Sequence, residues 1–256
     1  MSVRTRVSVA VLAGLMGFAA QAAAQIPGMP LFTNPRWGSG IRVHADLGQA
    51  VDAGTTIGDQ TVAQAGLSLA MGALGLNANV GTNFNRAREI GTGGEYDLSD
   101  SFTGSALAQI RVAGGGRSNL SLSVFGGGSM EVTGSEVALG TVNVEYPKYA
   151  TFPVGASLGL RIPLGLASLN LWGAGRMVFA KYMNCPDSDP VVGTVTLTGL
   201  STMCDETDRK FRWAVGADLP IFRILSIRAA YDSGKIEDQT VSYWGVGASI
   251  GIGGMR

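Results

Sequence analysis

Apolar and polar residues alternate along most of this chain from about residue 41 onward. In the first such segment, residues 41–53, the polar side chains of Arg42, His44 and Asp46 are separated by apolar neighbours. Successive side chains of a β-strand point to opposite faces, so this spacing predicts a strand with one apolar and one polar face. Later segments repeat the pattern, and one carries asparagine at alternate positions 77 and 79. Such a polar face suits contact with water better than a buried soluble core.

The same reasoning predicts ten strands, separated by connections of two kinds. The predicted strands lie near 41–53, 61–70, 76–84, 101–113, 119–130, 151–162, 168–182, 211–219, 227–232 and 241–252. Short turns fall near 71–75, 114–118, 163–167 and 220–224, and long polar loops near 86–100, 131–150 and 183–209. Eight strands is the alternative count, because the stretch 129–150 is ambiguous and the second strand is weak.

The outward faces of the predicted strands are apolar or glycine almost throughout, including strands that would be sheet edges in a soluble sandwich. In lipid, every backbone polar group needs an internal partner, so only helices and closed barrels can span a membrane. The fold class predicted is therefore all-β, a closed antiparallel transmembrane barrel over residues 40–256.

The N-terminal residues predict secretion. Arg4 and Arg6 precede an apolar stretch, and the alanines at 22–24 form a small-residue cleavage site, which is typical of a signal peptide over residues 1–24. Residues 25–39 contain Pro27, Pro30 and Pro35 and no strand pattern. We interpret them as a periplasmic linker that leads into the barrel.

Composition narrows the function. Outside the signal the chain has 17 basic and 19 acidic residues, so we expect no nucleic-acid partner. Only 15% of residues are charged and 38 are glycine, as expected for a barrel with one face in lipid and one polar face. No motif predicts a cofactor.

The pattern resembles that of the small bacterial outer-membrane β-barrels, the broad group with OmpA-like, opacity-protein-like and OmpW-like members. The most specific match is the last strand, Tyr243 to Ile252, where apolar residues alternate with glycine and serine. Members usually end in an aromatic residue, whereas this chain ends in Met255-Arg256. The resemblance implies a bacterial outer-membrane location with both chain ends periplasmic and the long loops extracellular. It implies lipid, lipopolysaccharide and the barrel-insertion machinery as partners.

Charged residues gather on the inward faces of the predicted strands. This luminal charge cluster consists of Arg42, His44, Asp46, Arg111, Arg161, Asp218 and Arg228. One interpretation is a set of ion pairs that fills a narrow barrel. The other is a positively charged constriction that favours anions.

His44, the only histidine, shares a strand face with Asp46, a pair that could orient a general base. Barrel proteases and lipid A-modifying enzymes of the outer membrane use histidine sites, but no stretch here reproduces their motifs. A hydrogen-bonded luminal histidine is the alternative.

The longest predicted loop, 183–209, contains both cysteines, Cys185 and Cys204. In an oxidising compartment they are expected to form a disulfide. The loop is also acidic, which makes a weak candidate calcium site of Asp187, Asp189, Asp205, Glu206 and Asp208. A solvated acidic loop is the alternative, and two cysteines without a nearby histidine do not make a zinc site.

Three functions follow from these features. The leading one is a narrow passive pore or structural barrel without enzymatic activity, anion-favouring if it conducts. The second is surface recognition or adhesion through the disulfide-closed loop 183–209, toward an unidentified ligand. The third is an outer-leaflet enzyme that uses His44.

Overall fold

The computed structural model describes residues 29–51, 60–84, 86–90, 94–115, 118–133, 135–139, 142–165, 167–192, 195–205, 207–221, 224–236 and 239–252. All regular structure in these residues is β-strand. The part of the chain described holds no helix that is both long enough and apolar enough to cross a membrane. The predicted signal peptide and the terminal Met255-Arg256 lie outside these residues.

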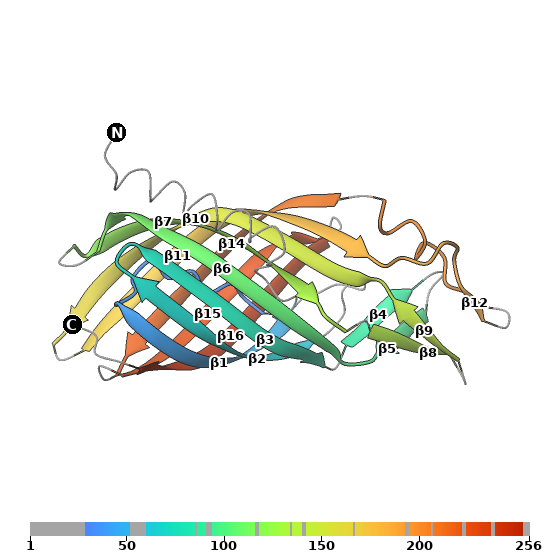
Figure 1. Cartoon of the computed structure of the whole chain (residues 1–256), viewed down its shortest axis with the longest axis horizontal. Helices are drawn as coiled ribbons and strands as arrows, with labels where there is room; N and C mark the ends of the chain where they lie inside the picture. The colour runs from blue at the N-terminus through green and yellow to red at the C-terminus, as the bar shows by residue number, and fades with distance from the viewer. Residues whose placement is uncertain are drawn as a thin grey trace.

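Ten strands close into an antiparallel barrel in the order β1-β16-β15-β14-β11-β10-β7-β6-β3-β2 (Figure 1). The first and last strands join, with Ile41 opposite Ile252 and Val51 opposite Ser242. The prediction of ten strands is therefore confirmed over the alternative of eight. Their bounds are β1 Gly40–Val51, β2 Thr61–Met71, β3 Leu74–Phe84, β6 Ser101–Gly114, β7 Leu120–Glu131, β10 Lys148–Leu164, β11 Ala167–Met183, β14 Thr207–Pro220, β15 Leu225–Ile236 and β16 Gln239–Ile252.

Because neighbouring strands run in opposite directions, the two kinds of connection lie at opposite ends of the barrel (Figure 1). We call the end with the short connections β2–β3, β6–β7, β10–β11 and β14–β15 the turn end. The opposite end, which carries β4, β5, β8, β9, β12 and β13, is the loop end. The strand order therefore confirms the prediction that short turns lie at one end of the barrel and long loops at the other.

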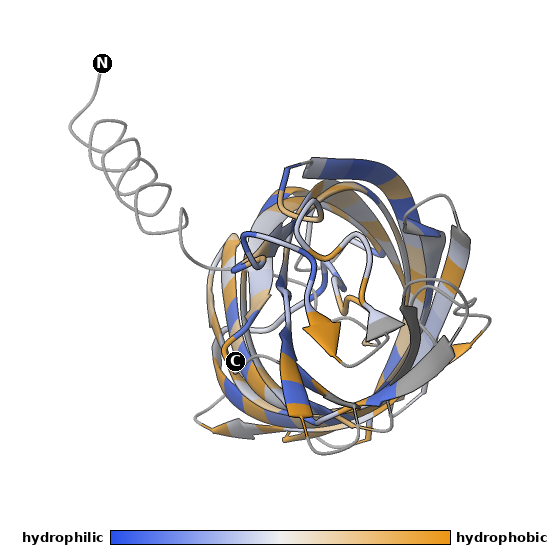
Figure 2. Ribbon diagram, turned by 90° about the vertical axis from the view of Figure 1, so that its right-hand side faces the viewer, coloured by the Kyte–Doolittle hydropathy of each residue, from blue (hydrophilic) through white to orange (hydrophobic). Residues whose placement is uncertain are grey.

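The predicted faces of the strands are also confirmed. Large apolar side chains such as Leu67, Val80 and Val154 are more than half exposed on the exterior, while Asn83 and Ser157 are buried inside. Apolar and polar bands alternate along the barrel strands in Figure 2. A closed barrel with an apolar exterior satisfies its backbone internally and presents hydrocarbon to its surroundings, which is what a lipid bilayer requires.

The long loops build a second structured layer at the loop end. β4 (Arg86–Ile90), β5 (Gly94–Leu98), β8 (Ser135–Leu139) and β9 (Val142–Tyr146) form a four-stranded sheet in that order. β12 (Val191–Val192) and β13 (Val195–Thr196) form a small hairpin within the loop 183–209. The two loop regions share one buried cluster, which consists of Leu98, Val137, Tyr146, Tyr182, Leu197 and Leu200.

The interpretation of residues 25–39 as a linker ahead of the barrel is wrong for the residues described. Residues 29–39, which we call the luminal segment, lie inside the barrel, and Met29 and Leu31 are buried there. Leu31 packs in the same cluster as Leu107 and Phe125, with Phe32 against it. The prolines that rule out a strand leave the segment free to pack as irregular chain within the wall.

Candidate functional site

The luminal segment runs from near the loop end, where its described part begins, to the turn end, where it leads into β1. Trp37 lies beside Gly75, close to the β2–β3 turn. At the other end of the segment, Met29 packs on Val62, the second residue of β2 and therefore near the loop end of that strand. Eleven residues thus cover a large part of the height of the lumen.

Hydrogen bonds attach this segment to the wall at successive levels. Near the turn end, Arg111 Nε donates to the carbonyl of Pro35 at 3.0 Å and its Nη2 to that of Trp37 at 2.8 Å. Closer to the loop end, Gln109 donates to the Thr33 carbonyl at 3.1 Å and the Leu31 amide donates to Asp232 at 3.3 Å. Irregular backbone is tolerated at membrane depth only where protein satisfies its polar groups, and these bonds do so.

Glycines in the wall make the room that the segment occupies. A Cβ on Gly159 would lie 2.7 Å from Pro35, and one on Gly245 would lie 2.8 Å from Pro30. Any larger residue at either position would displace the segment. Gly245, one of the alternating glycines predicted on the inner face of the last strand, therefore has a packing role that periodicity did not reveal.

Two arginines of the predicted luminal cluster lie over aromatic rings of the segment. Arg111 lies 4.5 Å from the Trp37 ring and Arg228 lies 4.4 Å from the Phe32 ring. The face of an aromatic ring attracts a cation, so these contacts stabilise both arginines. Both arginines are thus engaged with the segment.

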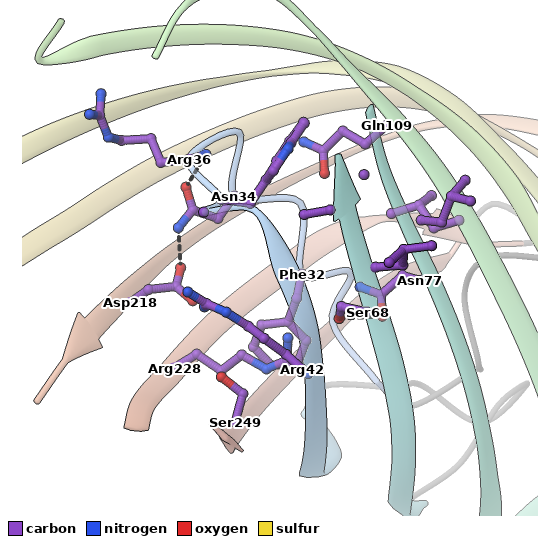
Figure 3. A pocket seen from close by; sticks show the side chains of 18 residues that line it. Phe32, Asn34, Arg36, Arg42, Ser68, Asn77, Gln109, Asp218, Arg228 and Ser249 are labelled. Carbon is purple, nitrogen blue, oxygen red and sulfur yellow. Dashed lines mark hydrogen bonds between the residues drawn. The ribbon is translucent and has the colours of Figure 1, made fainter. Parts of the chain in front are cut away.

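The two aspartates of the luminal charge cluster, Asp46 and Asp218, are bonded to different partners. Asp46 receives both Arg228 Nε, at 2.7 Å, and Arg228 Nη2, at 2.6 Å. Asp218 accepts from Asn34 at 2.9 Å (Figure 3) and from Trp172 at 2.9 Å, and its charge attracts Arg42. This bonding matches the ion-pair interpretation of the cluster.

Arg161 differs from the other members, because it is exposed at the turn end. It adds positive charge beside Arg36 and Arg111, not within the lumen. The turn-end mouth is therefore a region of positive potential.

His44 is buried and bonded through both ring nitrogens. Its Nε2 contacts Asn79 Oδ1, and its Nδ1 lies 3.3 Å from the Ser68 hydroxyl. Ser68 in turn donates to Asn77 at 3.0 Å. Asp46 accepts hydrogen bonds from Arg228 and Gln64, so the described hydrogen bonds orient the imidazole through Asn79 and Ser68.

A second cluster of charged side chains lies in the lumen closer to the loop end, and it was not part of the predicted luminal charge cluster. Asp232 is fully buried and paired with Arg176 and, at 2.9 Å, with Arg212. Arg212 also lies 4.8 Å from the Tyr243 ring. Alternation within each strand is enough to place these side chains inward. Whether they contact one another depends on the register of β11, β14, β15 and β16, which cannot be read from the sequence of any one strand.

Two cavities lie between the described parts of the luminal segment and the wall. A cavity of about 100 Å³ lies at the turn end, lined by residues that include Asn34, Arg42 and Asp218 (Figure 3). Another, of about 20 Å³, lies beside His44.

At the loop end, the predicted disulfide between Cys185 and Cys204 is present, with Cα atoms 5.9 Å apart. Asp189 accepts from the amides of Gly199, at 2.8 Å, and Ser201, at 2.9 Å. These bonds lower the pKa of the Asp189 carboxyl. Glu206 lies outside the described residues, and those that are described contain no group of three or more metal-ligating side chains. Asp189 thus organises a turn.

The chain matches no protein-family model and no curated protein. Solved structures that resemble it are outer-membrane barrels. The translocator domain of the autotransporter NalP from Neisseria meningitidis is 14% identical, with 84% of this chain and 90% of that chain covered and a TM-score of 0.45. Ail, the attachment invasion locus protein of Yersinia pestis, is 13% identical, with coverages of 83% and 98% and a TM-score of 0.36. The outer membrane protease OmpT from Escherichia coli is 6% identical, with coverages of 84% and 94% and a TM-score of 0.37. The likeness is one of barrel architecture.

Proposed function

We propose that this chain is an outer-membrane structural barrel, closed by its own luminal segment, which holds a structured region at the loop end. Of the two forms of the leading hypothesis, passive pore and structural barrel, the geometry supports the second. The observation that carries the proposal is the fit between segment and wall. Side chains of β6 donate hydrogen bonds to the segment, the Leu31 amide of the segment donates to Asp232 of β15, and Gly159 and Gly245 leave the space that the segment fills.

The charges of the lumen support the same choice. An anion-selective constriction needs cations that face water. Here Arg228 is paired with Asp46, and Arg111 donates to backbone carbonyls of the segment. These side chains hold the interior together, which leaves them poorly placed to attract a passing ion.

Surface recognition is the second candidate, favoured by the order of the loop end. The two loop regions pack through a shared buried cluster, and the disulfide closes the loop that contributes Leu197 and Leu200. A preorganised surface loses less conformational entropy on binding. This role requires the loop end to face outward, which labelling of intact cells can test.

Planar-bilayer conductance of the refolded full mature chain tests the closed barrel. We expect no steady conductance for the natural protein. Gly159→Val places side-chain carbon within 2.7 Å of Pro35 and should displace the segment, giving discrete steps with reversal potentials that favour anions. Valine suits a strand at least as well as glycine, so the wall should still form.

Gly126→Val is the matched control, because a Cβ at this outward-facing position has its nearest contacts at 3.9 Å. It should remain as silent as the natural protein. Steady conductance of the natural, fully folded protein would overturn the closed barrel and restore the passive pore.

A further inference from the structure

Three cations lie on the exterior of the barrel, close to the loop end. Lys181, Arg209 and Lys235 are exposed and belong to β11, β14 and β15, three neighbouring strands of the wall (Figure 1). Arg209 is two residues from the exposed Phe211, and Lys235 is four residues from the exposed Tyr231. Alternation therefore places both side chains on the face that is turned toward lipid.

The strand register brings these side chains near one another. Lys181 and Arg209 are offset by two residues in the pairing of β11 with β14, which makes them diagonal neighbours. Diagonal neighbours on antiparallel strands lie about 7–8 Å apart, a distance that long side chains can span. Lys235 follows Gly234, the last residue of β15 that is paired with β14, so it lies near the same end of β14 as Arg209.

The charges of these three side chains are available to a partner. The ion pairs found among the described residues involve none of the three. Asp208, which precedes Arg209 in the chain, has its carboxylate 3.5 Å from Lys210. Basic side chains that are grouped at the edge of a membrane-facing surface attract anionic lipid headgroups.

Aromatic side chains indicate the depth of the three cations in the membrane. Trp213 and Tyr231 are exposed on β14 and β15, and their rings lie 5.7 Å apart. Tryptophan and tyrosine favour the interface between hydrocarbon and headgroups. Arg209 and Lys235 each lie four residues farther toward the loop end, which is about 13 Å along a strand. Because barrel strands are tilted, the height above the interface is smaller, and the cations fall at the level of the headgroups.

We propose that Lys181, Arg209 and Lys235 bind the phosphate group of a lipid in the leaflet around the loop end. The guanidinium of Arg209 is a planar donor that suits two phosphate oxygens, and the lysines of the flanking strands add charge on either side. Exposed Met177 and Phe211 continue the same face toward the membrane and offer an apolar surface to the acyl chains. The site is on the exterior, so it goes beyond the proposed closed barrel and does not depend on it.

Native mass spectrometry of the full mature chain in detergent, titrated with diphosphorylated lipid A, tests this site. We expect saturable binding by the natural chain, and binding about a hundredfold weaker for lipid A from which both phosphates have been removed. Arg209→Gln should weaken binding of the phosphorylated lipid about fivefold, and the triple change with Lys181→Gln and Lys235→Gln about a hundredfold. Arg161→Gln is the matched control, because it removes an exposed charge at the turn end and should leave the affinity unchanged.

Equal affinity of the natural chain for lipid A with and without its phosphates would overturn the proposal, because the acyl chains alone would then account for binding. Equal affinities of the Arg209→Gln and Arg161→Gln variants would also overturn it. Inorganic phosphate that binds as tightly as the lipid would refute a lipid as the occupant. A natural protein that conducts but still prefers the phosphorylated lipid would refute only the closed barrel.

Discussion

Asp232 connects the barrel wall to the luminal segment through ion pairs and a hydrogen bond in the half of the lumen nearer the loop end. Its carboxylate faces Arg176 and Arg212, and the same group accepts the amide of Leu31 at 3.3 Å. All three charged side chains are almost completely buried. A buried pair contributes little net stability, but removal of one member leaves an uncompensated charge.

Asp232→Asn should therefore destabilise the barrel strongly. The amide keeps the shape of the carboxylate but leaves the two buried guanidinium groups without their anion, which costs about 3–5 kcal/mol. Guanidinium-induced unfolding of the chain in detergent, followed by tryptophan fluorescence, measures the free energy of unfolding. Asp208→Asn is the control, because Asp208 pairs with Lys210 at 3.5 Å in a partly exposed position and should cost at most about 1 kcal/mol. Equal losses for both variants would contradict this account.

Alternation within β11, β14 and β15 is enough to place Arg176, Arg212 and Asp232 on the inward face, and the structure buries all three. It did not predict that they would meet. Arg176 is opposite Arg212 across β11 and β14, whereas Asp232 lies on β15 opposite Ala214. That contact depends on strand register, which is set by the whole barrel and is weakly encoded in any one strand.

At the scale of elements, the loops depart most from what the sequence predicted. The long loops were expected to be polar connections, yet they form the sheet β4-β5-β8-β9 and a buried cluster. The strands involved are five residues long, and β5 meets β8 at a single pair, Leu98 with Val137. Such short strands are specified by the packing of one loop on another, so periodicity within a loop could not reveal them.

Asp189 should make the order of the disulfide-closed loop depend on pH. Its folded-state pKa is lowered by hydrogen bonds from the Ser201 and Gly199 amides and the Ser201 hydroxyl. A lowered pKa means that the stabilisation is present above the ordinary aspartate value near 4 and is lost as the pH falls through the folded-state value.

We therefore expect hydrogen-exchange protection of the Gly199 and Ser201 amides to persist at pH 5–7 and to decline below about pH 4. The comparison requires correction for the intrinsic pH dependence of exchange. Asp189→Asn should reduce protection at pH 6 and flatten the dependence. A profile of the natural protein identical to that of Asp189→Asn would show that this carboxylate does not order the loop.

The luminal segment is the other element that periodicity did not place. Pro30 and Pro35 correctly excluded a strand, but nothing in a non-repeating stretch states whether it lies outside or inside a barrel. A signal was present in two distant parts of the chain: apolar Met29, Leu31 and Phe32 ahead of the first strand, and inward glycines at 159 and 245. Their complementarity is visible only once the strands are closed.

At the scale of the whole molecule, charge differs between the two ends. The four short connections, near 71–75, 114–118, 163–167 and 220–224, contain no acidic residue, whereas the three long loops contain most of the acidic residues of the barrel. The turn end therefore has positive potential and the loop end negative potential. The molecule is polar along its axis, and the two ends would meet different partners.

Cysteine labelling of intact bacteria should establish which end faces outward. Both natural cysteines form the disulfide, so a single introduced cysteine is the reactive thiol. We expect a membrane-impermeant maleimide to label Thr198→Cys, at the exposed loop end, on intact cells. Asn119→Cys, exposed at the turn end, should be labelled only after the outer membrane is opened. The reverse result would invert the proposed topology.

The glycines that face the luminal segment have an energetic consequence for the barrel itself. Glycine within a strand costs about 0.5–1 kcal/mol relative to alanine, since it loses more backbone freedom on folding. Gly75, Gly159 and Gly245 are each in contact distance of the segment, so the wall is weakest where the segment lies against it. An empty barrel would keep this weakness without the contacts that offset it. Barrel and segment therefore form one cooperative unit, in which the first residues of the described chain stabilise strands far from them in the sequence.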